Sequence, residues 1–131
     1  MPFAALGLEH ITLHVKDVAT AQKFYMDVLG CVLDRVNPTV PLTHLKFGPH
    51  QIDLVPGDGI GPPEAGLNHF CLSIQCDDIE ALAGELTAKG AELRGPIKSR
   101  YGAYGTGPSL YLVDPDGYVV ELKPRDAARA G

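Results

Sequence analysis

The chain has 131 residues, of which 45% are hydrophobic and 21% charged, and this suits one globular domain with its own core. Its net charge of -5 argues against a nucleic-acid partner, because nucleic-acid-binding surfaces are basic. No apolar run is long enough to cross a bilayer, and the start does not resemble a signal peptide. The cysteines Cys31, Cys71 and Cys76 form no Cys-x-x-Cys motif, so we expect reduced thiols in a cytoplasmic protein without a membrane partner.

The first half of the chain, residues 7–57, is expected to begin with a strand and a helix. Residues 8–15 alternate between apolar and polar side chains, a pattern typical of a strand. Asp17 is a good N-cap for a helix whose apolar residues recur at helical spacing, and Gly30 supplies its stop. Three further short strands are expected, at residues 31–36, 42–47 and 50–55.

A linker rich in Gly and Pro, residues 56–66, leads to the second half, residues 66–124. A strand is expected first, then a helix that Asp77 or Asp78 caps and Gly90 ends. The strands of this half are expected at residues 67–75, 92–95, 108–113 and 118–122. Each half is therefore predicted to be a βαβββ unit.

Two segments that connect strands in the second half are recognisable from their turn-forming and glycine-rich sequences. Asp114-Pro115-Asp116-Gly117 indicates a tight turn between the last two strands. Residues 100–107 are rich in Gly and are expected to form a loop. With Arg100 and Tyr104 on it, this loop either covers a substrate or is a plain connection.

The two halves repeat each other. Gly7-Leu8-Glu9-His10-Ile11-Thr12-Leu13 returns as Gly66-Leu67-Asn68-His69-Phe70-Cys71-Leu72. A repeat of this period indicates two copies of one supersecondary unit packed against each other. Corresponding residues then meet near a pseudo-twofold axis: His10 with His69, and Asp53 with Glu121. Two imidazoles and two carboxylates at one point predict a metal site.

Strand parity supports the same prediction, because side chains alternate between the faces of a strand. On the first strand Leu13 and Val15 suit the face covered by the helix, and His10 falls on the other face. On the last strand Val120 and Leu122 are the core pair, which leaves Glu121 on the opposite face. We expect two such sheets to form a cup with a polar interior, where a ligand site belongs.

These residues also carry a resemblance to a known family. The matching stretches are Leu8-Glu9-His10-Ile11-Thr12-Leu13, Phe24-Tyr25 with Leu29-Gly30, Asn68-His69-Phe70, and the run of residues 112–122. Together they resemble the vicinal oxygen chelate superfamily, which includes glyoxalase I, extradiol dioxygenases, fosfomycin-modifying transferases and bleomycin-resistance proteins. The resemblance covers residues 6–124 and implies an α+β fold of two βαβββ modules in a cupped mixed sheet.

The resemblance also implies a ligand set. The first and last strands of each module carry the metal ligands in that superfamily, and these positions fall on His10, Asp53, His69 and Glu121. The ion would be zinc, nickel, iron or manganese. Asp53 is one methylene shorter than the Glu common in glyoxalase I, so it either ligates or lies behind the ligands. If Asp53 does not ligate, the remaining ligands are His10, His69 and Glu121. This set of two histidines and one carboxylate suits Fe(II) or Mn(II).

The implied chemistry is that of lactoylglutathione lyase, with Glu121 either a ligand or the base that takes a proton beside a carbonyl. Thr12, Ser109 and Tyr111 resemble positions that contact the substrate in fosfomycin transferases. The alternatives are an extradiol-type dioxygenase, a fosfomycin-type thiol transferase and a non-catalytic drug-sequestering protein. Members of the family often pair modules across a dimer, so a homodimer is expected. His14 and His44 have no repeat-related partner and His50 lies beside a turn, so none of the three is expected to be a ligand.

Overall fold

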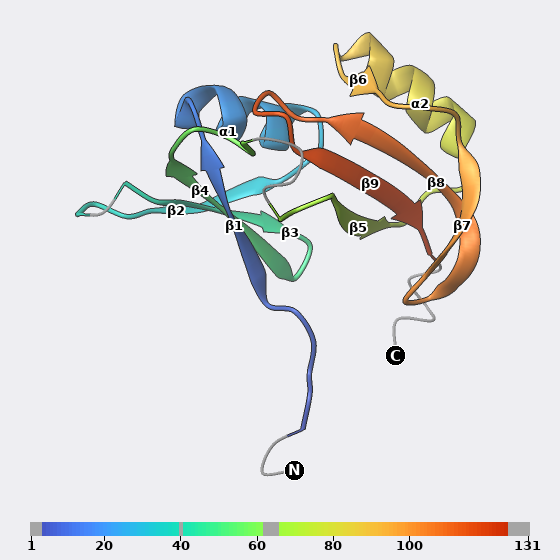
Figure 1. Cartoon of the computed structure of the whole chain (residues 1–131), viewed down its shortest axis with the longest axis horizontal. Coiled ribbons are helices and arrows are strands. Elements are labelled where there is room, and N and C mark those ends of the chain that lie inside the picture. Colours follow the sequence, from blue (N-terminus) through green and yellow to red (C-terminus); the bar gives the residue numbers. More distant parts are fainter. Residues whose placement is uncertain (1–3, 40, 62–65, 126–131) are drawn as a thin grey trace. The chain divides into compact units, whose positions relative to one another are not determined.

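The structure is a computed structural model that describes residues 4–39, 41–61 and 66–125. The chain divides into two compact units, unit 1 (Met1–Gly59) and unit 2 (Ile60–Gly131), whose elements are labelled in Figure 1. Each unit combines a β-sheet with a helix, which confirms the α+β class expected from the repeat. Within the described ranges, no helix has the length and apolar character that crossing a membrane requires.

Unit 1 is a mixed sheet with the strand order β1-β4-β3-β2. β1 and β4 are parallel, whereas β3 is antiparallel to both of its neighbours. Helix α1 contacts β4, the strand next to β1 in the sheet. The described elements of this unit are β1 (His10–Val15), α1 (Val18–Asp27), β2 (Val32–Val36), β3 (Thr43–Phe47) and β4 (His50–Pro56).

Local sequence explains how β1 and α1 form. Leu13 and Val15 are buried while the alternate side chains of β1 are exposed, as the parity of the strand predicts. Asp17 caps α1 by accepting a hydrogen bond from the Ala19 backbone N–H at 3.1 Å. Tyr25 is fully buried on the apolar side of this helix, and the helix packs against β4.

Truncation of Leu54 in the middle of β4 is expected to destabilise unit 1. Leu54 is 0% exposed, so Leu54→Ala leaves a cavity and should cost about 2–5 kcal/mol of unfolding free energy. Urea unfolding followed by circular dichroism measures this loss. Val36→Ala, at a side chain on β2 that is 57% exposed, is the control and should change stability little. Equal effects of the two substitutions would contradict the placement of the core.

Unit 2 repeats the scheme with one more strand. Its sheet has the order β5-β9-β8-β6, and β7 also pairs with β8. β5 and β9 are parallel, as β1 and β4 are in unit 1. Asp78, one of the two predicted caps, accepts from the Ala81 N–H at 3.1 Å. The described elements are β5 (Phe70–Ile74), α2 (Ile79–Ala88), β6 (Glu92–Leu93), β7 (Lys98–Gly102), β8 (Gly105–Val113) and β9 (Val119–Pro124).

The prediction of a loop at residues 100–107 was wrong, because these residues form a β-hairpin. β7 pairs with β8 from Lys98 opposite Ser109 to Gly102 opposite Gly105, with a two-residue turn between them. The Lys123 side chain lies across this hairpin, where its Nζ donates to the Arg100 carbonyl at 2.8 Å and to the Gly107 carbonyl at 3.0 Å. A Cβ at Gly102 would come within 2.9 Å of Lys123 Cε, so the glycine that resembled a loop residue makes room for this lysine.

Candidate metal and substrate site

In unit 1, the predicted ligands His10 and Asp53 lie on adjacent strands. His10 Nδ1 donates to Glu9 Oε1 at 2.9 Å, because a carboxylate oxygen can only accept. His10 Nε2 then faces Asp53 Oδ2 at 3.9 Å. The Asp53 side chain is 5% exposed and that of His10 is 41% exposed, so the carboxylate is buried behind a more accessible imidazole.

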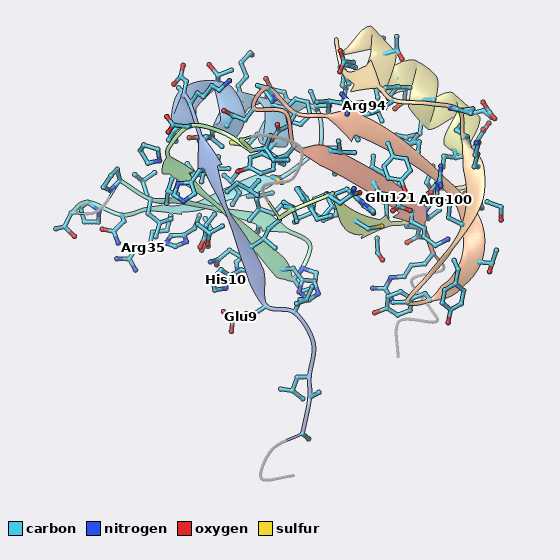
Figure 2. All side chains as sticks on the ribbon, in the orientation of Figure 1. Glu9, His10, Arg35, Arg94, Arg100 and Glu121 are labelled. Atoms are coloured by element: carbon cyan, nitrogen blue, oxygen red, sulfur yellow. The ribbon has the colours of Figure 1, made fainter. Side chains whose placement is uncertain are left out.

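Unit 2 repeats this arrangement with His69 and Glu121. His69 Nδ1 lies 2.7 Å from the Asn68 side-chain oxygen, so the repeat places an acceptor before each histidine. His69 Nε2 lies 3.1 Å from Glu121 Oε1, and the Glu121 side chain is 8% exposed. Figure 2 labels Glu121 on β9 and His10 on β1, the strands from which the two pairs arise.

These two pairs fit a divalent ion. An imidazole that donates through Nδ1 has a lone pair on Nε2 when it is neutral, so each Nε2 and its carboxylate face each other as two acceptors. Such a pair needs a proton or a cation between its members. Neighbouring ligands about 2.1 Å from one ion lie about 3.0 Å apart at a right angle and about 3.4 Å apart at the tetrahedral angle. The 3.1 Å pair of unit 2 falls in this range, and the 3.9 Å pair of unit 1 exceeds it.

Each carboxylate also has a hydrogen-bond donor on the strand beside it. His44 on β3 stands opposite Asp53 in the sheet, and its Nδ1 donates to Asp53 Oδ1 at 2.7 Å. Tyr111 on β8 stands opposite Glu121 in the sheet, so its hydroxyl is a candidate donor for that carboxylate. Burial, followed by the charge and hydrogen bond of Glu121, raises the pKa of Tyr111 above its ordinary value, so this hydroxyl is a donor at neutral pH.

Each unit supplies part of the predicted ligand set. Unit 1 brings His10 to Asp53, and unit 2 brings His69 to Glu121. Over residues 4–39, 41–61 and 66–125, no group of three or more His, Cys, Asp or Glu side chains is placed to hold a metal ion. A four-ligand site therefore remains a prediction. His44, which lacks a repeat-related histidine, joins the site of unit 1 through Asp53.

A cavity of about 550 Å³ opens beside the His69 pair in unit 2. Its polar lining includes His69, Arg94, Arg100 and Tyr111, and its apolar lining includes Ile60 and Val119. The Tyr111 ring meets the His69 ring edge to face at 5.3 Å, and the Arg100 guanidinium lies 4.8 Å from the centre of the Tyr111 ring. Arg100 and Glu121 are labelled on this sheet in Figure 2. The cavity thus combines positive charge with the candidate ligand His69.

The remaining residues predicted to contact a substrate are placed differently. Ser109 is fully buried and stands opposite Lys98 in the register of β7 and β8, and its Oγ has no hydrogen-bond partner among the described residues. Thr12 stands opposite Asp53 on β1 in unit 1. Tyr104 lies at the turn of the β7–β8 hairpin, where the Arg125 guanidinium stacks on its ring at 3.9 Å, and it is not part of the cavity lining. Sequence reasoning missed Arg94 and Lys123, since neither belongs to the repeated pattern.

The Cys71 thiol, opposite Glu121 on β5, is expected to react slowly although its residue is exposed. Desolvation and then the Glu121 charge raise its pKa to about 11 from 9.0, so less thiolate is present at pH 8 than in an unfolded chain. Iodoacetamide should alkylate Cys71 of the metal-free protein about 100-fold more slowly than the urea-unfolded protein. Peptide mass spectrometry measures both rates, and the folded rate should rise tenfold per pH unit up to about pH 11. Equal rates at pH 8 would contradict the environment assigned to Cys71.

The model of the glyoxalase/bleomycin resistance protein/dioxygenase superfamily matches residues 7–122 of this chain. A probable lactoylglutathione lyase of Vibrio cholerae is 31% identical over an alignment of 133 positions that covers 93% of each chain. Glutathione transferase FosA of Serratia marcescens is 29% identical over 88% of this chain and 79% of its own length. A structure of the fosfomycin resistance protein FosX from Listeria monocytogenes, in complex with Mn(II) and a sulfate ion, has a TM-score of 0.74.

The FosX structure is 23% identical to this chain and covers 95% of it and 94% of the FosX chain, which shows a shared fold. The family model spans both units, and it includes His10, Asp53, His69 and Glu121. These matches confirm the resemblance drawn from the repeated motifs. The chain belongs to the glyoxalase/bleomycin resistance protein/dioxygenase superfamily.

Proposed function

We propose that this protein is a metal-dependent enzyme that isomerises a small substrate through two neighbouring oxygens, with chemistry of the lactoylglutathione lyase type. The observation that carries the proposal is the repeated pair of an imidazole Nε2 facing a buried carboxylate. His10, His69 and Glu121 would hold the ion, and Asp53 would complete the set. The two pairs would meet around one ion, either within a chain or across a homodimer.

The residues of unit 2 have separate roles in this chemistry. A bound divalent ion would supply positive charge that stabilises the negative charge developing on the substrate oxygens. Glu121 would take a proton from the carbon beside a carbonyl and return it to the neighbouring carbon, so no atom is gained or lost. Its burial beside His69 keeps water from competing for that proton, and Tyr111 and Arg100 would orient the substrate in the cavity.

One observation favours a second candidate, a thiol transferase acting on an anionic antibiotic such as fosfomycin. Arg100 Nε is buried and unpaired among the described residues, and Arg94 lines the same cavity as Arg100. An unpaired buried donor is costly, and an oxyanion of the substrate would satisfy it. The similarity to FosA supports this candidate, whereas the similarity to lactoylglutathione lyase supports the first.

Activity assays with defined metals test the proposal. The protein is stripped with a chelator and reloaded with Ni²⁺, Zn²⁺, Mn²⁺ or Fe²⁺. Formation of S-lactoylglutathione from methylglyoxal and glutathione, dependent on the added metal, is the expected result. Adduct formation from fosfomycin and glutathione would replace the first candidate by the second, and oxygen consumption with a catechol would indicate a dioxygenase. Tight binding of bleomycin without any turnover would contradict enzyme function.

A further inference from the structure

The two carboxylates of the proposed metal site are held by different side chains at corresponding places in the repeat. β3 lies antiparallel to β4 in unit 1 as β8 lies antiparallel to β9 in unit 2. His44 stands directly opposite Asp53, and Tyr111 stands directly opposite Glu121. Directly opposed side chains lie on the same face of a sheet and are close enough to interact. The duplication has therefore placed a donor beside each carboxylate, although the donor residues differ.

In unit 1, His44 binds one oxygen of the Asp53 carboxylate and leaves the other oxygen free to face His10. His44 Nδ1 donates to Asp53 Oδ1 at 2.7 Å, while Oδ2 is the oxygen that faces His10 Nε2. The His44 side chain is 18% exposed and that of Asp53 is 5% exposed, so water competes weakly for this bond. A short side chain with one oxygen fixed in this way has few orientations left for the second oxygen.

In unit 2, Tyr111 on β8 contacts Glu121 on β9, whose other neighbouring strand is β5. Tyr111 stands opposite Glu121, whose charge and hydrogen bonding help to raise the pKa of the Tyr111 hydroxyl, and the Tyr111 ring contacts both His69 and Arg100. Arg100 is itself anchored, because Lys123 Nζ donates to its backbone carbonyl at 2.8 Å. These two contacts limit the movement of the Tyr111 ring, so its hydroxyl is a well-oriented donor for the Glu121 carboxylate.

We propose that His44 and Tyr111 are positioning residues that orient Asp53 and Glu121 for the metal ion. This inference rests on the proposed metal site. Neither residue would touch the ion. Each would fix one carboxylate so that its free oxygen is directed at the ion, and side chains with this role commonly account for 10–100-fold in metal affinity.

Metal affinity without substrate tests the proposal, since a role only in substrate binding would leave it unchanged. Ni²⁺ is titrated into metal-free full-length protein in competition with a colorimetric chelator, because Ni²⁺ binds more tightly than Mn²⁺ and weakened sites remain measurable. His44→Ala and Tyr111→Phe should each lower the affinity about 10–100-fold. His44→Asn, which keeps an N–H near the position of Nδ1, should restore most of the affinity.

Double variants separate positioning from a general structural effect. In an Asp53→Asn background His44→Ala should have no further effect, and the same should hold for Tyr111→Phe in a Glu121→Gln background. Tyr101→Phe, at an exposed tyrosine on the adjacent strand β7, is the control for hydroxyl loss. Thermal unfolding of every variant identifies any that fail to fold.

The outcomes distinguish this inference from the proposed function. Wild-type protein that binds no Ni²⁺ would overturn both. Wild-type binding with unchanged affinity in His44→Ala and Tyr111→Phe would overturn the positioning role alone. Losses that persist in full in the Asp53→Asn and Glu121→Gln backgrounds would also overturn it, because the donors would then not act through the carboxylates.

Discussion

Replacing His69 with alanine is expected to lower the affinity of the protein for a divalent metal ion by more than about 100-fold. His69 Nε2 lies 3.1 Å from Glu121 Oε1, so this substitution removes a predicted ligand and leaves its buried carboxylate without that partner. Loss of a residue that only supports a ligand costs 10–100-fold, and loss of a ligand should cost more. Elemental analysis of the purified variant and chelator competition with the reloaded variant measure the effect.

His50→Ala is the matched control for this prediction. His50 is an exposed residue at the start of β4 that has no place in the proposed site, so its loss should leave metal content unchanged. Equal metal content in wild-type protein and His69→Ala would exclude His69 as a ligand. Equal losses in both histidine variants would instead indicate adventitious binding to surface imidazoles.

Replacing Glu121 with glutamine is expected to lower kcat/KM for the isomerisation by about 10²–10⁴-fold. The amide keeps the size of the side chain and one oxygen but cannot accept a proton at neutral pH. The Glu121 side chain is 8% exposed, so water cannot readily replace the lost carboxylate. Steady-state assays of metal-loaded protein measure the loss, and metal content is determined on the same samples.

The metal content divides the two possible roles of Glu121. A variant that keeps the ion but loses turnover identifies Glu121 as a base, whereas loss of both identifies it as a ligand. Glu85→Gln, at an exposed position of α2 that is distant from Glu121 in the sequence, removes the same charge and should leave kcat/KM unchanged. Wild-type kcat/KM in metal-loaded Glu121→Gln would contradict both roles.

Most of the fold could be predicted because the chain repeats itself. The alternation in β1 and the N-caps Asp17 and Asp78 predicted local structure that the coordinates confirm. The exception was the β7–β8 hairpin, whose glycines at positions 102, 105 and 107 resemble those of a loop. Gly102 and Gly107 are explained by a long-range contact, the passage of Lys123 across the hairpin, which no local pattern in the sequence indicates.

The candidate site was predictable only where the repeat preserves residue type. His10 and His69 are identical in the two copies, and Asp53 and Glu121 are both carboxylates. His44 was expected not to be a ligand because no repeat-related partner for it was evident, whereas the strand register places Tyr111 at the corresponding position. A comparison of positions in the strand register, instead of residue types, would have found this pair. Arg94 could not be found in this way, because it reaches the cavity from the segment after β6.

The stoichiometry of metal binding tests the central claim, that the two histidine–carboxylate pairs hold one shared ion. Isothermal titration of metal-free protein with Ni²⁺ is performed on wild-type protein, His10→Ala and His69→Ala. The account predicts one tightly bound ion per chain in wild-type protein and loss of that ion in each variant. Two ions per chain, or full retention of the ion when one of these histidines is replaced, would contradict it.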